Sequence, residues 1–162
     1  MRNVYLDKTE LNGCTSVFVT DAKIIPAGTT ICYMGTKHKN EEYQKYADDY
    51  DIHFIFDDDI PVLAFYTVPQ VDILARDSEG GFIGTVGQRS DLESDAPICY
   101  INNQQECFLI AKTGKEFLKI ADSWKHHLEP YSDIVFYGSK SEAEKELEFI
   151  EVPNLNLSSR FN

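Results

Sequence analysis

The chain has 162 residues, a length that is ordinary for one domain and short for two. Hydrophobic residues make up 43% and aromatic residues 12%, which excludes a disordered chain and supplies a core without disulfide or metal staples. The net charge of −12, from 27 acidic and 15 basic residues, disfavours binding to nucleic acid and to anionic membranes. Acidity favours a basic protein partner, although it also serves solubility alone.

Neither a signal peptide nor a membrane span is visible in the sequence. Residues 1–5 contain no apolar run of signal-peptide length, and no stretch approaches the roughly 18 consecutive apolar residues of a membrane span. We therefore expect a cytoplasmic protein with no membrane partner.

The four cysteines have neither metal-ligand nor redox-motif spacing, because the closest two are eight positions apart. They are Cys14, Cys32, Cys99 and Cys107. Each lies in an apolar, strand-like segment, so in a reducing compartment they are expected to be small buried hydrophobic residues. A disulfide is the alternative.

The first third of the chain predicts two strands and a helix. Cys14–Thr20 and Thr30–Met34 are rich in strand-forming residues, with a turn at Pro26–Gly28 between them. Lys39–Tyr50 predicts a short helix, because its tyrosines recur at intervals of three and four. Asp51–Phe56 then alternates polar and apolar residues, as a half-buried strand does.

The middle of the chain predicts an antiparallel meander. The expected strands are Val62–Tyr66, Val71–Arg76, Phe82–Val86, Ile98–Ile101 and Cys107–Ala111. The expected turns are Thr67–Pro69, Asp77–Gly81 and Asn102–Gln105, with a polar loop at residues 87–96. Within the second strand, alternation places Val71, Ile73 and Ala75 on one face.

An amphipathic helix with a capping box follows the meander. In this motif the hydroxyl of Thr113 and the carboxylate of Glu116 each satisfy an orphan backbone N–H at the helix start. One stripe of the helix is apolar: Phe117, Leu118, Ile120, Ala121, Trp124 and Leu128. We expect this stripe to pack on the meander, and Pro130 to end the helix.

The C-terminal part predicts one more strand and one more helix. The strand is expected at Asp133–Tyr137, and Ser139 with Glu142 begins a second capped helix that runs to Leu147. Residues 154–162 are expected to form a frayed tail. Since no repeat or linker divides the chain, residues 1–162 are expected to form one α+β domain.

No motif predicts a catalytic site. Four glycines invite a phosphate-loop interpretation: Gly80, Gly81, Gly84 and Gly87. They lead into a strand and a polar loop, whereas a phosphate cradle needs a strand-to-helix junction. Four histidines are present: His38, His53, His126 and His127. None has an evident carboxylate partner and there is no Gly-x-Ser-x-Gly elbow, so we expect no catalytic residue and no cofactor.

Acidic residues gather in three clusters. They are Asp48, Asp49 and Asp51; Asp57, Asp58 and Asp59; and Asp91, Glu93 and Asp95. The alternatives are a solvated acidic rim, a docking surface for a basic protein, and a metal or catalytic site. No EF-hand loop is present, and consecutive Asp residues on an extended segment point in opposite directions, so no metal site is predicted. These residues are the candidate partner-binding surface.

Three segments carry a resemblance to a known family: Asp77–Gly87 (DSEGGFIGTVG), Ala96–Asn102 (APICYIN) and Cys107–Leu118 (CFLIAKTGKEFL). The pattern is a glycine-containing turn, a strand, an apolar strand that ends in a polar residue, and a last strand that leads into a helix start. Over residues 62–128 the chain resembles the SUKH superfamily, which includes bacterial toxin-immunity proteins and fungal regulators of cell-wall glucan synthesis.

The resemblance implies a twisted, largely antiparallel sheet of about six strands with helices packed on one face. It implies a non-catalytic binding protein, in bacteria one that neutralises a cognate toxin such as a basic nuclease or deaminase. The acidic charge agrees, since an acidic protein can occupy a basic substrate groove. The alternative function is a small-molecule-binding domain or hydrolase, with carboxylates such as Asp72 or Asp77 in a cleft on the sheet face.

Overall fold

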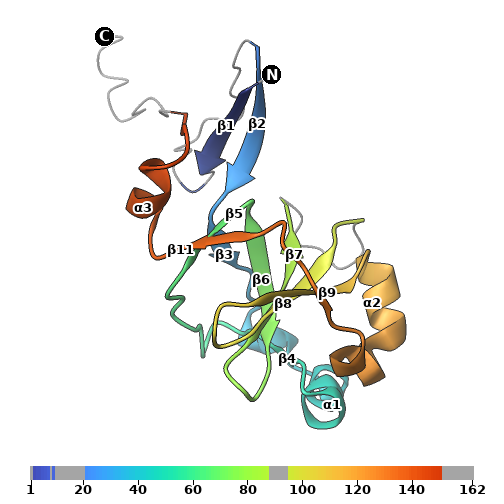
Figure 1. Ribbon diagram of the computed structural model, residues 1–162. Coiled ribbons are helices and arrows are strands. Elements are labelled where there is room, and N and C mark those ends of the chain that lie inside the picture. The colour runs from blue at the N-terminus through green and yellow to red at the C-terminus, as the bar shows by residue number, and fades with distance from the viewer. Residues whose placement is uncertain (1, 8, 10–20, 88–94, 151–162) are drawn as a thin grey trace.

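Figure 1 shows the computed structural model of the chain, which describes residues 2–7, 9, 21–87 and 95–150. The strands are β1 (Arg2–Asp7), β2 (Ala22–Ala27), β3 (Thr29–Ile31), β4 (His53–Phe54), β5 (Tyr66–Val68), β6 (Val71–Arg76), β7 (Phe82–Val86), β8 (Ile98–Ile101), β9 (Cys107–Ala111), β10 (Glu129–Pro130) and β11 (Val135–Tyr137). The helices are α1 (Glu41–Tyr50), α2 (Gly114–Ile120) and α3 (Lys140–Glu144), with 3-10 helices η2 (Thr36–His38) and η3 (Ala121–His126). The fold is α+β, as the sequence predicts.

The predicted meander forms the centre of the sheet. Strands β6, β7, β8 and β9 follow one another in antiparallel order, and their bounds coincide with the expected ones. Within the described residues the sheet has seven strands in the order β10-β9-β8-β7-β6-β3, with β4 also paired to β6. Because β3 runs parallel to β6, the sheet is mixed at that edge. Branched and aromatic residues form these strands, since their side chains suit a pleated surface.

Strand β6 contains an irregularity that corrects one prediction. Val71 and Ile73 belong to one buried cluster, whereas Ala75 belongs to the cluster on the opposite face. The pairing with β7 shifts register between Ile73 and Ala75, so the strand has one extra residue at this point. The expectation that all three share a face is therefore wrong, because a bulge reverses the alternation that follows it.

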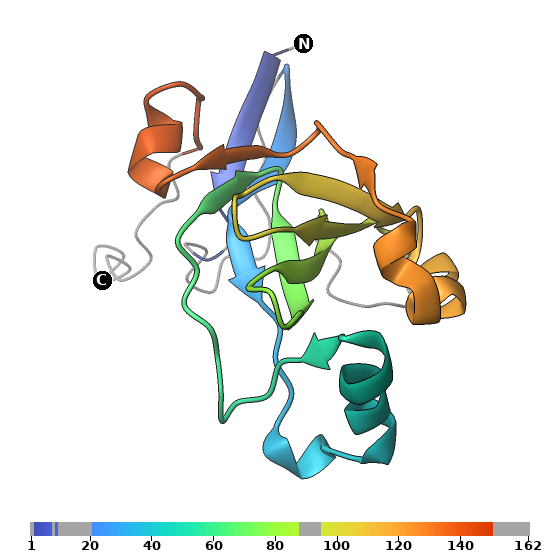
Figure 2. The same ribbon diagram turned by 60° about the horizontal axis from the view of Figure 1, so that its bottom comes forward.

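Side chains of helices α1 and α2 belong to the buried cluster on one face of the sheet, and Figure 2 shows both helices on the same side of the molecule. The buried side chains of Phe117 and Trp124 pack there against Ile98 and Tyr100 of β8. Helix α2 begins at Thr113, whose hydroxyl accepts a hydrogen bond from the backbone N–H of Glu116 at 3.1 Å. The half of the capping box that Thr113 supplies is confirmed, as is the predicted packing of this helix on the meander, whereas the contact predicted for the Glu116 carboxylate stays a prediction.

The segment after α2 does not continue as the single helix that the apolar stripe predicts. It becomes the 3-10 helix η3, in which Ser123 has non-helical backbone angles. The indole N–H of Trp124 donates a hydrogen bond of 2.7 Å to the carbonyl of Tyr50, the last residue of α1. This contact joins η3 to α1. Leu118, expected on the apolar stripe, is 42% exposed.

The other face of the sheet is covered by extended chain. Leu63, Phe65, Tyr131 and Phe136 pack there on the cluster that contains Val71 and Ile73. The expected strand at residues 62–66 is wrong: Val62 is 94% exposed and the paired strand is β5, which lies antiparallel to β11. The apolar alternation before β5 therefore reflects side-chain packing without strand pairing.

Strands β1 and β2 and helix α3 lie outside the meander in Figure 1. Strand β1 pairs in parallel with β2, and Ser139 caps α3 by accepting a hydrogen bond from the N–H of Glu142, as expected for a second capped helix. The predicted strand at 14–20 and the predicted tail at 154–162 lie outside the described residues. Of the helices in the described segments, not one combines the length and the apolarity needed to cross a membrane.

Candidate functional site

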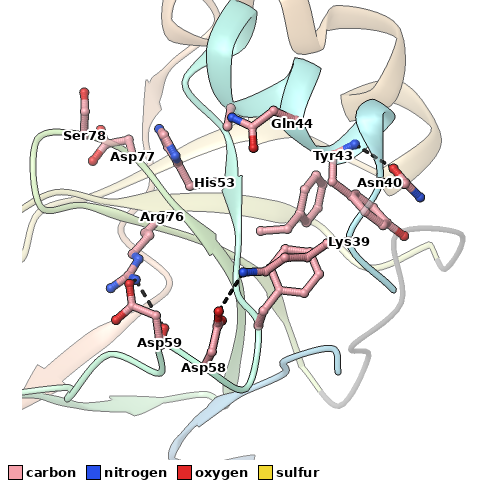
Figure 3. Close-up of a pocket in the computed structure, with 13 residues that line it drawn as sticks. Lys39, Asn40, Tyr43, Gln44, His53, Asp58, Asp59, Arg76, Asp77 and Ser78 are labelled. Atoms are coloured by element: carbon pink, nitrogen blue, oxygen red, sulfur yellow. Dashed lines mark hydrogen bonds and ion pairs between the residues drawn. The ribbon is translucent and has the colours of Figure 1, made fainter. Parts of the chain in front are cut away.

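A cleft of about 460 Å³ opens between α1, β4 and the end of β6. Figure 3 shows that its charged side chains come from segments far apart in the sequence. The residues that line it are Lys39, Asn40, Tyr43, Gln44, Ala47, His53, Phe54, Phe56, Asp58, Asp59, Arg76, Asp77 and Ser78. The cleft is defined here by this set.

One wall of the cleft is aromatic. The ring of Tyr43 lies edge-on to those of Phe54 and Phe56, with centroid separations of 5.3 and 5.9 Å. Tyr43 stands in the first turn of α1 because Asn40 caps the helix, accepting the backbone N–H of Tyr43 at 3.0 Å. Phe54 lies in β4, whose pairing with β6 places it beside the sheet. Helix start and strand pairing therefore position this wall.

Two ion pairs stand at the mouth of the cleft. The ammonium of Lys39 lies 2.7 Å from Oδ2 of Asp58, and the guanidinium of Arg76 contacts the carboxylate of Asp59. The hydrogen bond from Lys39 lowers the pKa of Asp58 from its usual value. Both carboxylates face solvent, since the Asp58 side chain is 50% exposed and that of Asp59 78% exposed. Each pair is thus weakly held.

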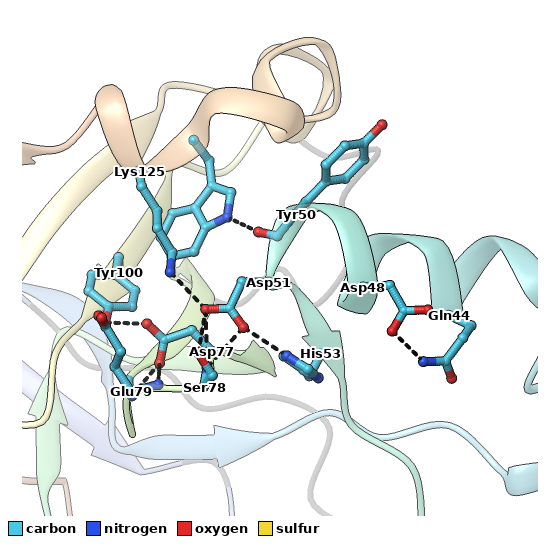
Figure 4. Close-up of polar contacts among 12 residues, drawn as sticks. Gln44, Asp48, Tyr50, Asp51, His53, Asp77, Ser78, Glu79, Tyr100 and Lys125 are labelled. Atoms are coloured by element: carbon cyan, nitrogen blue, oxygen red, sulfur yellow. Dashed lines mark hydrogen bonds and ion pairs between the residues drawn. The ribbon is translucent and has the colours of Figure 1, made fainter.

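A second polar cluster, the Asp51 network, adjoins the cleft and consists of Asp51, His53, Ser78 and Lys125 (Figure 4). The carboxylate of Asp51 accepts hydrogen bonds from His53 Nε2 at 2.8 Å, Ser78 Oγ at 2.8 Å and Lys125 Nζ at 2.7 Å. The backbone N–H of Ser78 donates to it as well, at 3.1 Å. Burial acts to raise the pKa of Asp51, but the hydrogen bonds from Lys125, Ser78 and His53 outweigh it and hold the pKa well below its usual value.

The Asp51 network joins three parts of the chain that the sequence separates widely. Asp51 ends α1 with a left-handed backbone, at φ 57° and ψ 37°, a conformation that Asp tolerates better than most residues. This turn directs its carboxylate toward the 77–81 turn and toward η3. The expectation that His53 has no carboxylate partner is therefore wrong. A helix-ending Asp directly before a strand is the signal that could have indicated it.

The order of contacts in the network does not match a nucleophilic triad. In a Ser-His-Asp triad the imidazole lies between the hydroxyl and the carboxylate and takes the hydroxyl proton. Here the carboxylate of Asp51 lies between Ser78 and His53, so the Ser78 hydroxyl donates to a group that is already ionised. The arrangement links elements of the fold, and the acceptor of the Ser78 hydroxyl is a carboxylate whose lowered pKa makes it a weak base.

Two of the carboxylates considered for a sheet-face site are buried and paired. Asp77 is 6% exposed and accepts hydrogen bonds from the Tyr100 hydroxyl at 2.6 Å and from the Gly81 N–H at 2.7 Å. Burial, together with the Asp77 contact, raises the pKa of Tyr100 above its usual value. Asp72 is 4% exposed and accepts from Thr30 at 2.6 Å. Asp77 contributes to the cleft lining, whereas Asp72 does not.

The acidic clusters named from the sequence separate into several environments. Asp48 accepts a hydrogen bond from Gln44 at 2.9 Å, and Asp49 is exposed on the same helix. Asp57 accepts the backbone N–H of Thr36 at 3.2 Å. Asp58 and Asp59 line the cleft, and Asp51 belongs to the network beside it.

The third acidic cluster does not join the other two. Asp95 is exposed and precedes β8 at Ile98, which pairs with Thr85 at the far end of β7. The cleft lies at the other end of the same strands, where Arg76 pairs with Phe82. Asp91 and Glu93 lie outside the described residues. The cleft residues that sequence reasoning missed are its cations and aromatic rings, because contacts across the fold bring them together.

The remaining residues considered for chemistry have structural positions. Gly80 has a positive φ of 87° in the turn between β6 and β7, where no helix follows. His127 lies 3.2 Å from the Ser123 hydroxyl near the end of η3. Among the described residues, no three side chains of His, Cys, Asp or Glu gather as a metal site would require. The described cysteines Cys32, Cys99 and Cys107 form no disulfide with one another.

Comparisons with models of known protein families, with curated proteins and with solved structures found no match to this chain. The fold and the cleft define an α+β domain with a mixed-charge, aromatic-walled cleft beside its sheet.

Proposed function

We propose that this chain is a non-catalytic protein-binding domain of the immunity type, which binds and neutralises a basic toxin domain such as a nuclease or deaminase. The observation that carries the proposal is the pair of exposed carboxylates, Asp58 and Asp59, at the mouth of an aromatic-walled cleft. Carboxylates beside aromatic rings suit the basic side chains that line a nuclease groove. The net charge of −12 adds long-range attraction to such a partner.

The arrangement of polar groups also favours binding over catalysis. The Ser78 hydroxyl donates to Asp51 rather than to an imidazole, and the buried carboxylate of Asp77 is already satisfied by Tyr100 and Gly81. A reactive centre would leave such groups directed at substrate. The resemblance to SUKH proteins points to the same function, and Cys32, Cys99 and Cys107, which form no disulfide with one another, suit a cytoplasmic location.

The proposal is tested with candidate toxin domains, namely the products of genes that neighbour the gene for this chain. The two purified proteins are mixed and their Kd is measured as salt is raised, and the chain is co-expressed with the active toxin. We expect tight binding that weakens with salt, and rescue of growth. Absence of binding at low salt would overturn the proposal.

A pair of variants locates the surface. Asp58→Asn combined with Asp59→Asn should weaken binding by about threefold to tenfold, mainly through slower association. Asp95→Asn removes one exposed charge at the other end of the sheet and should leave the Kd unchanged. Circular dichroism of each variant shows whether it is folded. If only the overall charge mattered, Asp95→Asn would show about half the loss in binding free energy of the double variant, because it removes one charge where the double variant removes two.

A second candidate function is the binding of a small molecule, with or without its hydrolysis. The cleft volume of about 460 Å³ favours it, because small-molecule sites commonly occupy about 300–1,000 Å³. His53 would be the base, since it lines the cleft and is paired with Asp51. Screening small-molecule mixtures by NMR separates the two functions. A ligand whose binding or turnover is lost in His53→Gln would favour this second function over the first.

A further inference from the structure

The cleft already contains a cation of the chain itself. The ammonium of Lys39 lies 2.7 Å from the Asp58 carboxylate and 5.2 Å from the centre of the Phe56 ring. Figure 3 shows the side chain extended between the aromatic wall and Asp58. A cation above an aromatic face and against a carboxylate is stabilised from two sides. The geometry therefore defines a position that accepts one positive charge.

Lys39 is a weak occupant of this position. Its side chain is 50% exposed, as is that of Asp58, and an exposed lysine pair contributes little because water solvates both charges. The flexible stem of lysine allows the ammonium to move into solvent without disturbing the backbone. Displacing it therefore needs only a better cation.

The groups around Lys39 are held in place without it. Arg76 donates to the backbone carbonyl of Asp59 at 3.2 Å as well as to its carboxylate. The Asp57 N–H donates to the carbonyl of Met34 at 2.9 Å. These bonds fix the 57–59 segment, and the Asn40 cap fixes Tyr43. A site that is formed before its ligand arrives loses less free energy to ordering on binding.

We propose that the cleft receives the side chain of a single arginine from the toxin partner, and that Lys39 occupies this position in the free protein. A guanidinium should bind at this position more tightly than an ammonium, for two reasons. Its planar fork donates two parallel hydrogen bonds to one carboxylate, and its flat face stacks on aromatic rings. Asp58 supplies the carboxylate, and Tyr43 and Phe56 supply the rings. This inference rests on the proposed function and names the chemistry of the contact.

The test uses a capped tripeptide, acetyl-Gly-Arg-Gly-amide, titrated into the full chain and followed by ¹⁵N NMR. The matched probe replaces arginine with citrulline, which has the same shape and no charge. We expect shifts at Tyr43, Phe56 and Asp58 with arginine, in the millimolar range of Kd, and none with citrulline. Equal binding of both probes, or shifts confined to other regions, would overturn the inference.

Variants test the part assigned to Lys39. Lys39→Ala removes the competing cation and should strengthen arginine binding by about threefold. Lys45→Ala removes an exposed positive charge of α1 that lies outside the cleft lining, and it should leave arginine binding unchanged. Asp58→Asn should weaken binding at least fivefold. If Lys39→Ala weakens arginine binding, or if phosphate binds to the wild-type cleft and not to Lys39→Ala, the cleft is an anion site and the inference fails.

The test of arginine binding and the test of the proposed function can give different results. A toxin that binds the chain while the arginine tripeptide does not would leave the proposed function standing and reject the arginine contact. Arginine binding at the cleft without toxin binding would support the contact chemistry and reject the immunity function.

Discussion

Replacing Asp51 with Asn tests whether one carboxylate joins α1, the 77–81 turn and η3. Asn keeps the left-handed backbone tolerable and retains one acceptor oxygen, so His53 and the Ser78 N–H can keep a partner. The oxygen that accepts hydrogen bonds from Lys125 and the Ser78 hydroxyl is replaced by an amide NH2 group, which cannot accept them, and the negative charge is lost. Lys125 is 42% exposed and regains water, which limits the loss. We expect destabilisation of about 1–2 kcal/mol, or a fall of about 3–6 °C in Tm.

The dependence of this effect on pH is specific. Since the folded protein holds the pKa of Asp51 below its unfolded value of about 3.9, the carboxylate stabilises the fold above that pH. The contribution is lost as pH falls below about 4, so the difference between wild type and Asp51→Asn should narrow there. Urea denaturation of both proteins at several pH values measures this difference in the free energy of unfolding.

The matched control is Asp49→Asn, an exposed change on the same helix that should alter stability by less than about 0.5 kcal/mol. The reasoning fails if Asp51→Asn behaves like this control at neutral pH. It fails equally if the loss for Asp51→Asn stays constant from pH 7 to pH 3, because the effect would then not come from an ionised carboxylate.

Three further changes test the core and the cap. Tyr100→Phe removes the hydroxyl that donates to buried Asp77 and should cost about 1–3 kcal/mol in urea denaturation. Because the pKa of Tyr100 is raised in the folded protein, the stability of the wild type should also fall as pH rises above about 10. This fall of stability with pH should be smaller in Tyr100→Phe. Trp124→Ala should cost about 3–5 kcal/mol. Its unfolding is followed by circular dichroism, because the chain has 1 tryptophan and the variant therefore has no tryptophan fluorescence. A loss below about 1 kcal/mol would contradict the place of Trp124 in the core. Thr113→Ala should cost about 1 kcal/mol and Thr113→Ser almost nothing, and equal losses would rule out the cap.

Local pattern was sufficient for the centre of the fold. Each strand from β6 to β9 is a short apolar run between turn residues, and each pairs with its neighbour in the chain. The cap at Thr113 depends on residues three positions apart. Predictions failed where a local irregularity changed direction, as at the bulge after Ile73 and at the non-helical Ser123 in η3. Neither leaves a distinct signal in hydrophobic periodicity.

The candidate site was predicted only in part. The sequence singled out Asp58 and Asp59 as members of an acidic cluster, and both line the cleft. It did not indicate that each has a cation opposite, because Lys39 and Arg76 lie 19 and 17 positions away from their partners. The sequence therefore predicts a purely acidic surface around Asp58 and Asp59, where the structure has a cleft of mixed charge.

The amino-acid sequence by itself determined the acidic character, the α+β class, the meander and the capped helices, because these depend on composition and on contacts within a few residues. Tertiary structure alone decided the cleft and the Asp51 network, in which Asp51 meets Lys125 across 74 positions. The physical reason is that a side chain's surroundings depend on the backbone angles of every residue between it and its partner. One left-handed residue at the end of α1 and one bulge in β6 set those directions here.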